Sequence, residues 1–141
     1  MTAQIYWLVD KRILLLKPMG EITEAAIQDN FARVQSMLEG IESSVYLIVD
    51  STEQHTVLSP AVAKKLAGVL RENMRAGIGD NVAWTILITN NVLMRFVTSL
   101  LVQWLGSKMR AFDSIQEALQ FLMERDITLP SDIKTHININ P

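Results

Sequence analysis

The sequence contains no cysteine and no large excess of charge of either sign. The absence of cysteine excludes disulfides, thiol catalysis, thiolate zinc sites and iron–sulfur ligation. Thirteen lysines and arginines stand against fifteen aspartates and glutamates, which gives a formal net charge of −2. Because such a chain has no global positive field for nucleic acid or an anionic membrane surface, we expect no nucleic-acid partner.

Motifs that carry catalysis are also scarce. The only histidines, His55 and His136, are too few for the ligand sets of zinc or iron sites. The glycine pair in segment 76–79 follows a predicted helix and precedes a predicted strand, which is the reverse of a phosphate-binding loop. No Gly-x-Ser-x-Gly elbow places a serine nucleophile. We therefore expect no cofactor, no metal and no enzymatic activity.

Length and composition favour one compact unit. The 141 residues are close to the usual size of a single domain, and 49% of them are hydrophobic, with a mean hydropathy of +0.20. The hydrophobic fraction is high for a soluble chain, so some of these residues are available for an interface. The first residues lack a basic region, an apolar run and a small-residue cleavage site, so we expect a cytoplasmic location. The most apolar predicted helix has about 14 residues interrupted by Arg95 and Gln103, too few for a membrane span.

Hydrophobic periodicity predicts a mixed α/β domain with about five strands and four helices in the order ββαβαβαβα. The first two strands form an antiparallel hairpin, and the crossovers through helices make the others parallel. The predicted strands are 5–9, 13–16, 45–49, 82–88 and 108–112. In the second helix, Val62 and Leu66 are expected to face inward, and Asp113 is expected to cap the last helix.

Residues 1–126 are expected to form the domain, and residues 127–141 a C-terminal tail. The tail is mostly polar but has apolar residues at alternating positions from Ile133 onward. We expect it to be disordered in solution, with an added strand on a neighbouring sheet as the alternative.

Three residues near the end of the third strand are candidates for modification or partner contact. Asp50 lies at the carboxyl end of a buried strand, where ligands gather in open α/β sheets, and Ser51 follows it. The alternative for Asp50 is structural, because its carboxylate can accept hydrogen bonds from Thr52 or Glu53. Ser59 precedes Pro60 and is expected to cap the second helix. A phosphate on that hydroxyl would lie at the positive end of the helix dipole.

The third helix, predicted to begin at Asn91, is unusually apolar. Its apolar residues cover an arc of about 180°, whereas a helix that only covers a sheet needs about 100°. Three side chains at the far edge of that arc, Met94, Leu101 and Leu105, are the candidates for self-association into a homodimer. A pocket for an apolar ligand and ordinary burial under neighbouring loops are the alternatives.

The whole order resembles the STAS domain of bacterial anti-sigma-factor antagonists and of the cytoplasmic tails of sulfate transporters. The resemblance rests on strand 84–88, the helix start 91–96 and the final segment 112–122. It implies a non-enzymatic switch that binds a serine kinase or anti-sigma factor and is released by phosphorylation at the start of the second helix. The family has an acid before, and a glycine after, the modified residue. This chain has neither in segment 57–61, so Ser59 matches by position alone.

The sequence therefore favours a protein-binding module of bacterial signalling that acts through loop 50–59 and the second helix. The alternative is a carrier of a small molecule or lipid that uses the apolar third helix.

Overall fold

A computed structural model describes residues 3–54, 59–77, 81–105, 108–130 and 133. The order of its elements is the predicted ββαβαβαβα. The strands are β1 (Gln4–Val9), β2 (Ile13–Lys17), β3 (Val45–Asp50), β4 (Val82–Ile88) and β5 (Met109–Phe112). The helices are α1 (Glu24–Leu38), α2 (Pro60–Gly77), α3 (Val92–Leu105) and α4 (Ile115–Arg125). None of these helices is both long enough and apolar enough to cross a bilayer, within the part of the chain that the structure describes.

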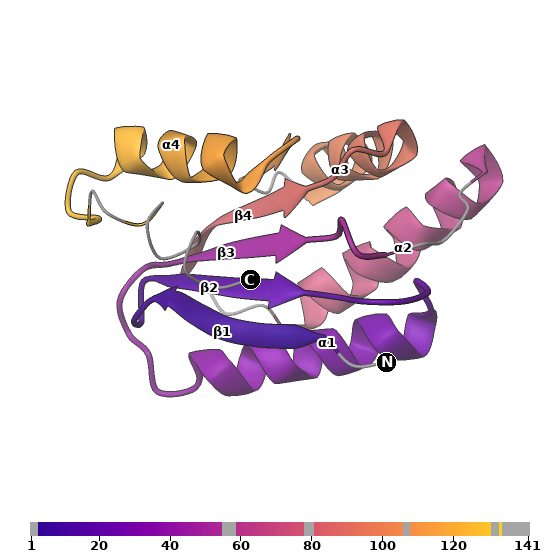
Figure 1. Cartoon of the computed structure of the whole chain (residues 1–141). Helices are drawn as coiled ribbons and strands as arrows, with labels where there is room; N and C mark the ends of the chain where they lie inside the picture. Colours follow the sequence, from indigo (N-terminus) through magenta and orange to yellow (C-terminus); the bar gives the residue numbers. More distant parts are fainter. Residues whose placement is uncertain (1–2, 55–58, 78–80, 106–107, 131–132, 134–141) are drawn as a thin grey trace.

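The strands form one sheet in the order β1-β2-β3-β4-β5, which is also their order along the chain (Figure 1). β1 pairs with β2 antiparallel, and all other pairs are parallel, as the sequence predicts. Because the parallel strands run in one direction, their carboxyl ends share one edge of the sheet, and α1, α2 and α3 all begin there.

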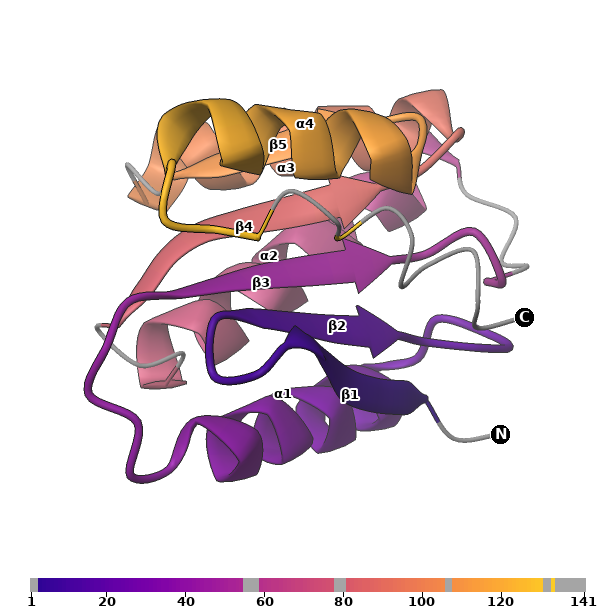
Figure 2. The same ribbon diagram turned by 60° about the vertical axis from the view of Figure 1, so that its left-hand side comes forward.

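Both faces of the sheet are covered by helices (Figure 2). Side chains alternate between the faces along each strand, as a pleated sheet requires. Leu14, Leu47 and Leu87 face the side of α1, α2 and α3, where two clusters of buried residues form the core. Tyr46, Ile48, Ile86 and their neighbours face the side of α4.

Side chains and a glycine cap the ends of α1 and α4. Thr23 accepts a hydrogen bond from the N–H of Ala26 at 3.1 Å, and Gly40 takes the left-handed conformation after α1. Asp113 does not cap α4. Ser114 does, since its hydroxyl accepts from the N–H of Glu117 at 3.2 Å.

The expected domain boundary at residue 126 falls inside the core. Leu129 and Ile133 are 7% and 1% exposed and pack on the α4 side of the sheet with Ile13 and Tyr46. In the structure, these two residues of the expected tail therefore pack against the domain. Residues 134–141, which include His136, lie outside the described part of the chain.

Candidate functional site

Asp50 closes a local turn at the carboxyl edge of the sheet. Its Oδ1 accepts hydrogen bonds from the backbone N–H of Thr52 at 3.1 Å and from the Thr52 hydroxyl at 2.6 Å. This is the structural role that the sequence left open as an alternative. The side chain still lies at the rim, where it is half-buried beside the segment that leads to α2.

Ser51 is buried and fully engaged, so it is not a surface contact. It is 8% exposed, and its hydroxyl donates to the carbonyl of Ile88 at 2.9 Å. Its backbone N–H donates to the same carbonyl at 3.0 Å. The prediction of Ser51 as a partner contact or phosphorylation site is therefore wrong, because this serine ties the end of β3 to the end of β4.

Ser59 caps α2, as predicted, and remains exposed. Its Oγ accepts from the N–H of Val62 at 3.2 Å, and its carbonyl accepts the first helical bond from Ala63 at 2.8 Å. The hydroxyl thus lies at the positive end of an 18-residue helix and is open to solvent. Residues 55–58, which include His55, lie outside the described part of the chain.

A groove of about 200 Å³ runs between the beginnings of α1 and α2, close to the helix start that Ser59 caps. Its lining is mostly apolar and includes two exposed residues of opposite charge, Glu24 from α1 and Lys65 from α2. The apolar residues that line it are Ile22, Ile27, Val62, Leu66 and Val69. Val62 is 45% exposed, so the prediction that it faces the core is wrong. The apolar side chains of α2 follow the predicted helical spacing, but in the first turn of the helix they face this groove.

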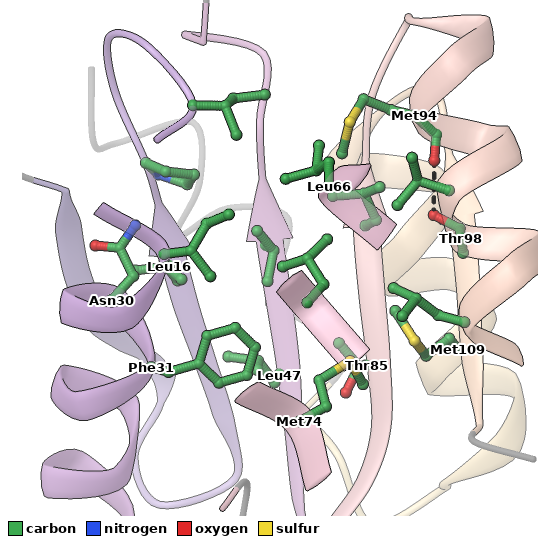
Figure 3. A pocket seen from close by; sticks show the side chains of 18 of the residues that line it. Leu16, Asn30, Phe31, Leu47, Leu66, Met74, Thr85, Met94, Thr98 and Met109 are labelled. Atoms are coloured by element: carbon green, nitrogen blue, oxygen red, sulfur yellow. Dashed lines mark hydrogen bonds between the residues drawn. The ribbon is translucent and has the colours of Figure 1, made fainter. Parts of the chain in front are cut away.

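An apolar cavity of about 110 Å³ lies under α1, α2 and α3, against the sheet (Figure 3). Phe31, Met74 and Met109 are among its walls, together with Leu47 from the middle of the sheet. The few polar side chains in the lining are Asn30, Gln54, Thr85 and Thr98. Of these, Thr98 donates its hydroxyl hydrogen to the carbonyl of Met94 at 3.0 Å within α3.

Two of the three side chains proposed for self-association face the core. Met94 and Leu101 are 7% and 2% exposed and line this cavity. They cannot form a surface for a second copy, because they already fill the contact between α3, α2 and the sheet. The side chain of Leu105 lies outside the described part of the structure. The exposed apolar residues of α3 are Val92, Phe96, Val102 and Trp104.

The clearest electrostatic coupling in the described part of the chain lies away from this edge of the sheet. Among the described residues, no three histidine, aspartate or glutamate side chains gather in a way that would hold a metal ion. The clear pKa shifts belong to a different place, the amino end of β3, where the structure joins Tyr46, Arg12 and Asp126. Hydrogen bonds from Thr128 and Tyr46 lower the pKa of Asp126 to about 2. Burial, and then the bond to Asp126, raise the pKa of Tyr46.

No family model matches this chain, and no curated protein matches it. Solved structures do resemble it, among them the following two. One is an uncharacterized protein of the DUF3478 family with a SpoIIAA-like fold from Shewanella loihica PV-4. It is 20% identical, with a TM-score of 0.56 over 86% of this chain and 92% of that one. The other is the anti-sigma factor antagonist SpoIIAA in its unphosphorylated form, which is 17% identical. Its TM-score is 0.53, over 87% of this chain and 97% of that one.

This chain has a SpoIIAA-like fold. The STAS-like architecture expected from the sequence is thereby confirmed. At these identities the likeness concerns the fold, and the function of this SpoIIAA-like chain has to be argued from its own residues.

Proposed function

We propose that this chain is a cytoplasmic, non-enzymatic regulatory module of bacterial signalling that binds a protein partner. The binding surface in this proposal comprises Asp50, Ser59 and the groove between α1 and α2. The observation that carries the proposal is the exposed Val62 in a mostly apolar groove whose lining includes two residues of opposite charge. Protein interfaces have this composition, with an apolar centre that excludes water and a polar border.

The fold adds independent support. One of the two similar structures is an anti-sigma factor antagonist. A binding role needs only a shaped surface, and the groove beside α2 supplies one.

Phosphorylation of Ser59 is the regulatory step that fits this surface. A phosphate there would add negative charge at the start of α2, one turn before Val62 of the groove. A partner that fits the unmodified groove would then meet repulsion and a larger desolvation cost. By resemblance, the candidate partners are a serine kinase and an anti-sigma factor. Pro60 directly after Ser59 restricts which kinase can accept the segment.

The experiment is affinity capture from the host with three tagged forms of the chain. These are the wild type, Val62→Asp, and Val102→Asp as the matched control on α3, where the valine is 37% exposed. We expect one protein to be retained by the wild type and by Val102→Asp and to be lost with Val62→Asp. Equal retention by all three forms would contradict the proposed surface.

The apolar cavity supports a second candidate function, the binding of a small apolar molecule. A cavity of about 150 Å³ in another protein takes up benzene, so about 110 Å³ holds a group of a few carbon atoms. Native mass spectrometry of protein from its host tests this candidate. A retained small mass would support it, and a bare chain mass would leave the cavity as a packing defect.

A further inference from the structure

Two arginines of the α4 side of the molecule lie against the same aromatic ring. The guanidinium carbon of Arg125, in the last turn of α4, lies 4.3 Å from the ring centre of Phe121. The guanidinium carbon of Arg110, in β5, lies 5.0 Å from the same centre. Each also lies over a second ring, Arg125 over Trp84 at 5.2 Å and Arg110 over Phe112 at 5.4 Å.

The rings form a platform that spans three elements. Phe121 of α4 meets Trp84 of β4 edge to face, with centres 5.1 Å apart and planes at 82°. It also meets Phe112 of β5 at 5.3 Å. Two arginines thus make four ring contacts within about 5.4 Å on this single platform. The rings therefore hold both guanidinium groups in place before any ligand arrives.

Neither arginine forms an ion pair within the described part of the chain. Lys108, at the start of the same edge strand, is likewise exposed and forms no ion pair there. Several carboxylates of the surrounding segment are already used elsewhere. Asp113 pairs with Arg95, Glu124 accepts from Gln120, and Asp126 pairs with Arg12.

Stacking leaves the N–H edges of a guanidinium group free in the plane of the group. That edge is the part that binds a carboxylate through two parallel hydrogen bonds. Three positive charges thus gather on one exposed edge of a chain whose net charge is −2. Close cations without a counter-charge repel one another, and an anionic ligand removes that cost.

We propose that Lys108, Arg110 and Arg125 bind an acidic segment of a protein partner. This site lies on the opposite face of the sheet from α2, so it is separate from the groove beside Ser59. A short acidic peptide matches three cations. A nucleic acid or a membrane requires a wider basic surface, and the negative net charge of this chain opposes both.

The test is a fluorescence anisotropy titration with a labelled peptide of alternating glutamate and serine, against the same peptide with glutamine. We expect saturable binding of the glutamate peptide only, weakened by added salt. The double variant Arg110→Gln/Arg125→Gln should lose at least about tenfold in affinity. The double variant Lys64→Gln/Arg75→Gln removes two exposed positive charges from α2 and should bind as the wild type does.

A third variant tests whether binding needs the fixed planar guanidinium groups or only their positive charge. Arg110→Lys/Arg125→Lys keeps both charges but lacks the planar group, so we expect it to lose affinity while thermal unfolding shows an intact fold. The proposal is overturned by equal losses in both glutamine variants, or by no saturable binding up to about 1 mM. It is also overturned if a single-stranded RNA or anionic vesicles bind more tightly than the peptide. None of these results bears on the capture experiment with Val62→Asp, which concerns the other face.

Discussion

The carboxylate of Asp126, directly after α4, accepts a hydrogen bond of 2.7 Å from the phenol of Tyr46 in β3, 80 positions earlier. The same oxygen pairs with Arg12 of the β1–β2 hairpin at 2.7 Å, and the other carboxylate oxygen accepts two bonds from Thr128. One side chain thus joins the hairpin, the central strand and the C-terminal segment at the amino end of the sheet.

This network predicts how stability depends on pH. The pKa of Asp126 is about 2 in the folded chain and 3.8 unperturbed, so the ionised form is favoured by folding. Its contribution is fully present above about pH 4 and is lost as the pH falls through 2. We expect Asp126→Asn to lower the free energy of unfolding by about 1–2 kcal/mol at pH 7. Urea unfolding of both forms from pH 7 to pH 2 should show the difference shrinking below pH 4. A difference that does not change with pH would contradict this assignment.

The helix cap at Ser59 makes a separate prediction about stability. Ser59→Ala removes the acceptor for the N–H of Val62 and should cost about 1 kcal/mol. Ser59→Asp restores an acceptor and adds a favourable charge at the helix start, so its stability should match the wild type. Any loss of the captured partner in Ser59→Asp then reflects the surface and not the fold. Equal destabilisation in both variants would show that Ser59 does not act as a cap.

The two sides of α3 should respond differently to a charge. Leu101→Glu places a carboxylate in the core under α3, where Leu101 is 2% exposed, and should cost several kcal/mol. Val102→Glu, at the next position, should change stability by less than about 1 kcal/mol, because Val102 is 37% exposed. Circular dichroism melts compare the two. A folded Leu101→Glu monomer obtained from a wild-type dimer in light scattering would restore the self-association surface first predicted for this side chain.

The segment after α4 should behave as part of the domain. Ile133→Ala deletes a side chain that is 1% exposed, and we expect it to cost about 2–4 kcal/mol. Ile127→Ala, at a residue that is 93% exposed, is the matched control and should stay within about 0.5 kcal/mol of the wild type. The measurement is the denaturant midpoint of unfolding of the two variants and of the wild type. Similar midpoints would mean that residues beyond 126 are not part of the core.

The sequence predicted those features that depend on local patterns. The element order, the antiparallel hairpin and the cap at Ser59 all follow from periodicity and short-range hydrogen bonding. The turn of Asp50 onto Thr52 was only the alternative to a contact role for Asp50. The cap of α4 was misplaced by one residue, because Asp113 and Ser114 are both good caps and only backbone geometry separates them.

Features that depend on which helices and strands pack against each other could not be predicted from the sequence. The apolar arc of α3 is wide, and nothing in it shows which edge packs on α2, so Met94 and Leu101 were assigned to the wrong side. The pairing of Arg12 with Asp126 spans 114 positions and leaves no local signal. The groove likewise exists only because α1 and α2 begin side by side at one edge of the sheet.

The central claim is that a protein partner covers the groove beside Ser59. The most direct measurement is amide hydrogen exchange on the chain alone and in complex with the protein retained by the wild type and lost with Val62→Asp. The account predicts new protection in the first turns of α1 and α2, with β1 and the middle of α3 unchanged. Protection confined to other elements, with the starts of α1 and α2 exchanging as in the free chain, would contradict it.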